Sequence, residues 1–180
     1  MRGAVSVVTV VLFLAFAAAL AVLAFVVDTQ AQRVLELDTQ TAASSAADFV
    51  ASQVRDAVSS GAVPGVASIR KALLIPQTFY GFDTATVSVC IGNSGGNIYV
   101  NVTLATTRGA GSAYASATSW VFNVTSWALT NGKGVYLVGS FRQCPNYQIP
   151  QQCVVDGMLD LASPGCAALV DRASIYVTTR

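Results

Sequence analysis

The sequence predicts an α+β protein in which a long N-terminal α-helix, hydrophobic at first and then amphipathic, precedes an antiparallel β-sheet head. Three observations predict this fold. Residues 4–60 contain neither glycine nor proline, the two residues that most often interrupt helices. From Thr84 onward the apolar residues adopt the alternation that is typical of β-strands. All four cysteines lie in that second part of the chain.

Composition argues against several functional classes. The chain is 53% hydrophobic and only 11% charged, with a net charge of +1. The longest basic patch is the pair Arg70-Lys71, so nucleic-acid binding is disfavoured. Histidine is absent and the acidic residues of the head are scattered. We therefore expect no enzyme and assign no catalytic, metal-binding or cofactor-binding residue.

The predicted helix begins with the apolar run Ala4–Val27, which is interrupted only by Ser6 and Thr9. A cleaved signal peptide, a transmembrane anchor and the hydrophobic half of an assembly helix are the three interpretations of this run. It is longer than the apolar region of a signal peptide, which has about 7–15 residues. The whole helix would be roughly 85 Å long, whereas a bilayer core needs roughly 30 Å. Membrane anchoring alone therefore does not explain its length.

Residues 28–60 are predicted to form an amphipathic stem that carries the head. Its apolar residues recur at spacings of three, four and seven, and most charged residues fall elsewhere around the helix. The predicted packing face comprises Ala31, Val34, Leu35, Ala42, Ala46, Phe49, Val50, Val54 and Ala57. Gly61 and Pro64 indicate the end of the helix. Residues 61–83 are predicted to be a linker, with a short helix or loop at 66–74.

The head is predicted to span residues 84–180. Apolar alternation at residues 87–91 and 98–104, on either side of Asn93-Ser94-Gly95-Gly96, predicts a β-hairpin. Further strands are expected at residues 117–124, 135–141, 153–159 and 173–179. A head of this size is large enough to bury a modest core.

The cysteines are Cys90, Cys144, Cys153 and Cys166. An even number behind a membrane-type segment predicts two disulfides and an oxidising compartment. Four cysteines allow three connectivities. The short loop between Cys144 and Cys153 favours that bridge, together with Cys90–Cys166.

Two glycosylation sequons occur, Asn101-Val102-Thr103 and Asn123-Val124-Thr125. Strand alternation predicts that Val100 and Val102 point inward, which would leave Asn101 exposed. The same reasoning applies to Asn123, between Phe122 and Val124. Both asparagines are therefore N-glycosylation candidates, and the alternative is two ordinary polar positions on the surface of the sheet.

Arg2-Gly3 is followed by the apolar run Ala4–Ala15, an uninterrupted long helix and a β-rich head. This layout resembles that of archaeal type IV pilins and the related archaellins. The resemblance rests on motif over residues 1–60 and on architecture beyond them. It implies a leader-processing site at Arg2 and Gly3, with cleavage after Gly3; whether that cut occurs is left open. Bacterial pilins carry a glutamate at the fifth position of the mature helix. No acidic residue precedes Asp28 here, which favours the archaeal branch.

The resemblance also implies an assembly mechanism. Residues 4–27 would hold the subunit in the cytoplasmic (inner) membrane, and an assembly ATPase and membrane platform would then extract it. Identical subunits would form a helical filament, with the small residues Ala15, Ala17, Ala18, Ala19 and Ala21 allowing close helix approach. The expected assembly core comprises Val8, Val11, Leu12, Phe13, Phe16, Leu20, Leu23 and Phe25.

We accordingly expect a subunit of an extracellular adhesive pilus, a homo-oligomeric filament without cofactors. One alternative is an archaellum subunit, rotated for swimming, although archaellin heads tend to be poor in cysteine. A second is a monomeric, membrane-anchored ectodomain that binds a ligand. That alternative predicts a flexible linker after Val27, where the sequence continues with helix-compatible residues.

Overall fold

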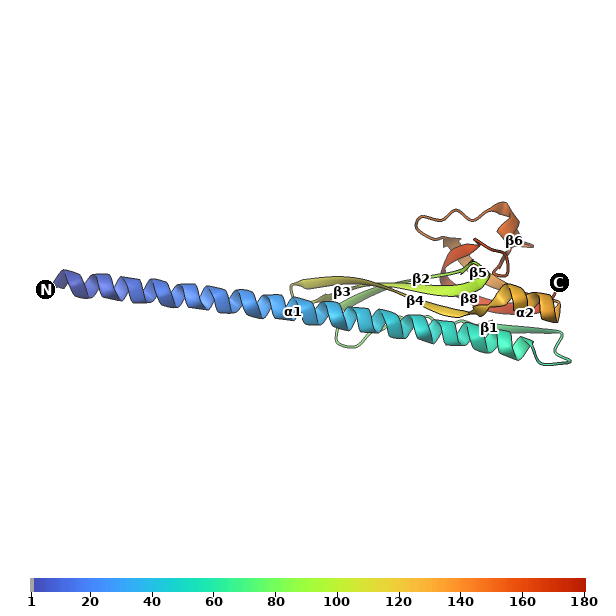
Figure 1. Cartoon of the computed structure of the whole chain (residues 1–180), viewed down its shortest axis with the longest axis horizontal. Coiled ribbons are helices and arrows are strands. Elements are labelled where there is room, and N and C mark those ends of the chain that lie inside the picture. Colours follow the sequence, from blue (N-terminus) through green and yellow to red (C-terminus); the bar gives the residue numbers. More distant parts are fainter. Residues whose placement is uncertain (1) are drawn as a thin grey trace.

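The computed structural model describes the backbone of residues 2–180 and the side chains of residues 7–180. One long helix, α1 (Arg2–Gly61), is followed by an antiparallel β-sheet and a short helix, α2 (Val124–Asn131). The predicted fold class is therefore confirmed. The N-terminal half of α1 projects beyond the head, and its C-terminal half lies along the sheet (Figure 1).

The sheet has eight strands in the order β4-β3-β2-β8-β5-β7-β6, with β1 paired to β8. All of the pairings are antiparallel. β8 is the central strand, because β5 lies along one edge while β2 and β1 share the other. The strands are β1 (Ser68–Ala72), β2 (Thr84–Ser94), β3 (Asn97–Arg108), β4 (Gly111–Asn123), β5 (Lys133–Gln143), β6 (Val154–Val155), β7 (Met158–Asp160) and β8 (Ala167–Thr179), and a 3₁₀ turn covers Gln151–Cys153.

The predicted hairpin is formed by β2 and β3. Ser94 pairs with Asn97, which leaves Gly95 and Gly96 as the two central residues of the turn. Their φ angles are 60° and 87°. A two-residue hairpin turn of this type needs positive φ at both central positions, which glycine adopts without steric cost.

Three strand predictions were wrong in extent. β4 begins at Gly111 and β8 at Ala167, in each case six residues before the predicted start. In the first half of β4 the positions that alternate with Ser112, Tyr114 and Ser116 are all alanine, which gives little hydrophobic contrast to detect. The strand predicted at 153–159 is divided between the 3₁₀ turn, β6 and β7. Asp156 and Gly157, with φ of 49° and 76°, make the turn between β6 and β7.

The predicted linker 61–83 is also ordered in part. Residues 68–72 form β1 rather than a helix or loop, because the free edge of β8 supplies hydrogen-bond partners at Ser174–Thr178. The Gln53 amide of α1 fixes the next residues. Its Nε2 donates to the Leu74 carbonyl at 2.9 Å, and the Leu74 N–H donates to its Oε1 at 2.7 Å.

The core lies between α1 and the inner face of the sheet. Val50, Val54 and Val58 of α1 are fully buried in one cluster with Ile91 and Val100 of the sheet. Each fully buried valine or isoleucine contributes about 1.5–3 kcal/mol. The helix also presents alanines to the sheet, which let the two layers approach closely; these are Ala43, Ala46, Ala47, Ala51 and Ala57.

Most residues of the predicted packing face of the stem are correctly placed. Leu35, Ala46, Val50, Val54 and Ala57 are buried, and Ala42 is half-buried. The prediction was wrong for Ala31, Val34 and Phe49, which are exposed. Val34 and Phe49 are exposed because they lie on the side of α1 that faces away from the sheet.

The C-terminal end of α1 is fixed by β5 and β8. The Lys133 ammonium donates to the Gly61 carbonyl and, at 2.6 Å, to that of Val66. A cation beside the last carbonyls of a helix is favourable. A Cβ at Gly61 would lie 2.6 Å from Cγ1 of Val177, so the end of the helix approaches β8 as closely as a glycine allows.

The disulfide pairing expected from loop length was wrong. The bridges are Cys90–Cys144 and Cys153–Cys166. Cys90 lies on the outer face of β2, and the chain that leaves β5 crosses this face to reach it. Cys144 therefore joins a cluster with Cys90 and Ala167, whereas Cys153 packs in the main core.

Replacing each cystine by a pair of serines should lower the free energy of unfolding unequally. The bridges span 54 and 13 residues of sequence. In the chain-entropy model they contribute about 4 and about 3 kcal/mol respectively. Denaturant unfolding of the two double variants measures the difference, and non-reducing peptide mapping tests the pairing. A peptide joining Cys144 to Cys153 would contradict it.

Candidate assembly surface

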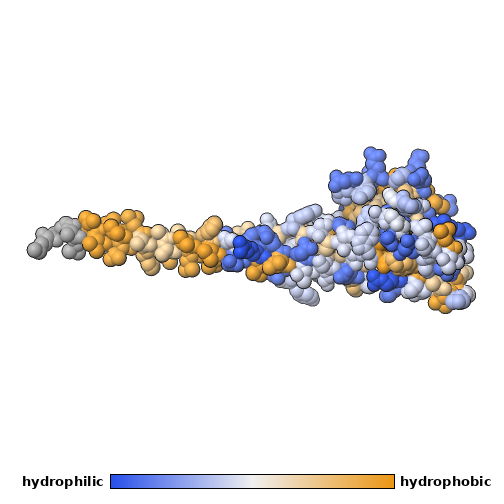
Figure 2. Space-filling view, in the orientation of Figure 1, coloured by the Kyte–Doolittle hydropathy of each residue, from blue (hydrophilic) through white to orange (hydrophobic). Residues whose placement is uncertain are grey.

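The projecting part of α1 is an exposed apolar segment. Every side chain from Val7 to Val27 is exposed, and none carries a charge. Figure 2 shows this apolar surface and the polar band that follows it, which begins at Asp28. The helix is long and apolar enough to cross a membrane.

The apolar side chains of this segment cover all sides of the helix, and the predicted core residues occupy about two thirds of its circumference. At 3.6 residues per turn, they are distributed around the helix rather than along one stripe. Their exposed fractions range from 49% for Leu20 to 72% for Phe25. A helix that is apolar on all sides is normally buried among several neighbours or in lipid. The set is Val8, Val11, Leu12, Phe13, Phe16, Leu20, Leu23 and Phe25.

A second apolar surface continues along the stem. Val34, Leu37 and Phe49 are 50%, 68% and 46% exposed, and they fall within about 120° of one another around the helix. They lie opposite the face that packs on the sheet. We call these three residues the outer stripe.

The spacing of apolar residues did not predict the outer stripe as a surface. Val34 and Phe49 were predicted on the packing face, and Leu37 was assigned to neither face. A projection around the helix would have separated them from Val50 and Val54, because the angle between the two sets is large.

Polar contacts hold the stem to the end of the sheet that is nearest the apolar segment. The Gln32 amide donates to the Ser112 carbonyl at 2.7 Å. Arg108 pairs with Asp38 at 2.9 Å, and the buried hydroxyls of Thr39 and Thr106 are 2.7 Å apart. The ion pair is half-exposed and so contributes at most about 1 kcal/mol. These contacts begin only a few residues after Val27, within unbroken helix.

The two sequon asparagines lie in different surroundings. Val100 and Val102 are fully buried, as predicted, and Asn101 is half-buried on the outer face of β3. Asn123 is exposed, but the strand does not continue to Val124. The Asn123 side chain accepts a hydrogen bond from the Ser126 N–H at 2.9 Å and so caps α2. Glycosylation of both stays a prediction.

The processing site predicted at Arg2 and Gly3 lies outside the side chains that the structure describes, and cleavage there stays a prediction.

Comparison of the chain with protein-family models, curated proteins and solved structures finds no match. Among the described residues, no three or more cysteines and carboxylates are arranged to hold a metal ion. Any assignment of function therefore depends on the geometry and chemistry of the surfaces described above.

Removing residues 1–27 should change the free energy of unfolding of the head by less than about 0.5 kcal/mol. The described side chains of this segment are all exposed, so the head loses little packing. As a control in the full chain, Leu35→Ala should cost about 2–5 kcal/mol, because Leu35 is buried. Denaturant unfolding measures both. A large loss of unfolding free energy on truncation would contradict the conclusion that the head is stable without the apolar segment.

Proposed function

We propose that this chain is the structural subunit of an extracellular filament of the archaeal type IV pilus kind, which polymerises through α1 and serves adhesion. One observation carries the proposal. α1 passes without a break from a segment that is apolar on all sides into the core of the head. An assembled filament needs this combination, because one part of the helix must be buried by neighbours while the other holds its own head.

The length of α1 supports assembly over simple anchoring. Its 60 residues correspond to about 90 Å, of which a bilayer core accounts for only about 30 Å. The apolar segment suits lipid and a protein core equally well, because both are apolar surroundings. A subunit would rest in the cytoplasmic membrane and then transfer this segment into a bundle of identical helices, driven by an assembly platform and ATPase.

Packing in such a bundle would use two parts of α1. The alanines between Ala15 and Ala21 permit close helix approach, and the large side chains around them supply buried area. The outer stripe would contact neighbouring subunits farther along the stem. Contacts of this head-to-tail type do not close on themselves and therefore produce an open helical polymer. The disulfide-bonded heads would form the outer wall, outside the cell.

The archaellum alternative shares this geometry. The two disulfides favour an adhesive pilus over a swimming filament, whose heads tend to be poor in cysteine. The monomeric ectodomain is less favoured, because no break separates the apolar segment from the stem and α1 is longer than an anchor requires.

Electron microscopy of material sheared from cells tests the proposal. We expect filaments that contain this chain, and their loss in the variant Leu20→Asp, since an unpaired charge among apolar neighbours is costly by several kcal/mol. Leu129→Asp is the matched control, because Leu129 is 79% exposed on α2 of the head. Filaments should persist in that variant.

Leu37→Asp separates assembly from membrane insertion, because Leu37 lies beyond the apolar segment and is 68% exposed. We expect it to reach the membrane fraction in normal amount and to form fewer or shorter filaments. A wild-type chain that remains a monomer in the membrane, or normal filaments from Leu20→Asp, would overturn the proposed function.

A further inference from the structure

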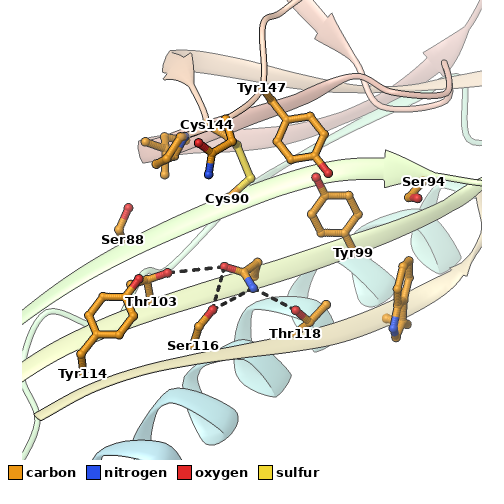
Figure 3. Close-up of a pocket in the computed structure, with 15 residues that line it drawn as sticks. Ser88, Cys90, Ser94, Tyr99, Thr103, Tyr114, Ser116, Thr118, Cys144 and Tyr147 are labelled. Carbon is orange, nitrogen blue, oxygen red and sulfur yellow. Dashed lines mark hydrogen bonds between the residues drawn. A yellow bond between two sulfur atoms is a disulfide. The ribbon is translucent and has the colours of Figure 1, made fainter.

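A groove of about 580 Å³ lies on the outer face of the sheet, on the side opposite α1 (Figure 3). Strands β2, β3 and β4 form its floor, and the loop that follows β5 forms one wall. Among the described residues that line it, none carries a formal charge. This is unusual for the solvated face of a sheet, where charged side chains are common.

Exposed aromatic rings border the groove. Tyr114, Trp120 and Tyr147 are 71%, 53% and 53% exposed. Tyr114 and Trp120 share one face of β4 because they are six positions apart, an even number, and they lie roughly 20 Å apart at about 3.3 Å per residue. Trp120 also packs edge-on against Tyr99, with ring centres 5.8 Å apart. The fold does not require these rings to be exposed.

The floor between the rings is polar and already organised. The Asn101 Nδ2 donates to the hydroxyls of Ser116, at 3.1 Å, and Thr118, at 2.9 Å. The hydroxyls of Thr103, Ser116 and Thr118 gather in the middle of the groove in Figure 3. Each hydroxyl has one donor and two acceptor sites, so the group retains capacity for a ligand.

A covalent bond fixes the wall. The Cys90–Cys144 disulfide attaches the loop to β2, and the Tyr147 N–H donates to the Cys144 carbonyl at 3.1 Å. The Tyr147 and Tyr99 hydroxyls point toward one another (Figure 3). Burial, followed by the neighbouring Tyr147, raises the pKa of the Tyr99 phenol, so this phenol is held in its neutral form.

We propose that this groove binds a neutral saccharide. The C–H faces of pyranose rings stack on tyrosine and tryptophan, whose rings are apolar with a polar handle. Sugar hydroxyls exchange hydrogen bonds with amide and hydroxyl side chains of the kind found on this floor. The lack of cationic side chains argues against phosphates, nucleic acids and acidic peptides. The distance between Tyr114 and Trp120 suits several linked rings better than one.

The saccharide has two possible sources with the same chemistry. One is an external chain of neutral sugars, and the other is a glycan attached to Asn101 of this chain. The site does not depend on filament formation. In a filament with α1 inside, however, this face would lie outermost and would meet external saccharides first.

The first experiment uses the full chain in detergent, produced in a host that does not glycosylate asparagine. Calorimetry follows its titration with linear hexaoses of glucose, of mannose and of N-acetylglucosamine. We expect at least one hexaose to bind, and Tyr114→Ala and Trp120→Ala each to weaken binding by about tenfold or more. Tyr80→Ala is the matched control, since Tyr80 is fully exposed but does not line the groove; it should bind normally. Thermal unfolding verifies that each variant is folded.

The second experiment tests the internal source with protein from a host that glycosylates sequons. Peptide mass spectrometry shows whether Asn101 carries a neutral glycan. Hydroxyl-radical labelling then shows whether Trp120 is less reactive than in the Asn101→Gln variant. Either hexaose binding that needs Tyr114 and Trp120, or such glycan-dependent protection of Trp120, supports the proposal. The absence of both, or hexaose binding that neither alanine variant weakens, overturns it.

Discussion

The packing of α1 on the inner face of the sheet is the contact on which the rest of the molecule depends. Val50, Val54 and Val58 occupy the same core as Val100 of the sheet, and the alanines beside them keep the layers close. Without the helix this face of the sheet would be open to water. The contact also gives α1 a fixed direction as it leaves the head. Because the C-terminal half of the helix already covers the inner face of the sheet, the apolar segment cannot fold back to pack there.

The position of Asp28 sets a second constraint. The apolar segment ends there, and the Gln32 amide already contacts the sheet. The polar band between them leaves no room for a flexible joint and is costly to bury in lipid or in an apolar core. Any apolar environment that accepts the segment must therefore stop just before the head. A membrane and a filament core of the proposed kind would impose the same boundary, so one helix would suit both.

Local sequence signals predicted part of this structure well. The absence of glycine and proline predicted α1, and Gly95-Gly96 predicted the hairpin, because both signals act within a few residues. β1 and the disulfide pairs could not be predicted in this way, since they depend on which strands flank β8. Cys90 and Cys144 are distant in sequence and meet only because the chain leaving β5 crosses the outer face of the sheet. The outer groove depends on three strands and that crossing, so no single segment indicates it.

The alternation of β3 nevertheless contains information about both faces. The pattern that buries Val100 and Val102 also places Tyr99 and Asn101 on the outer face. Lysine or glutamate at these two positions would be sufficient to keep the outer face soluble. Instead the groove on the outer face of β2, β3 and β4 is lined by rings, amides and hydroxyls without charge, and a disulfide holds a loop across it. Exposing aromatic rings to water is unfavourable, and the packing of the head does not account for their exposure. A ligand that covers the rings would account for their exposure, for the organised hydroxyls between them and for the bridge that fixes the wall.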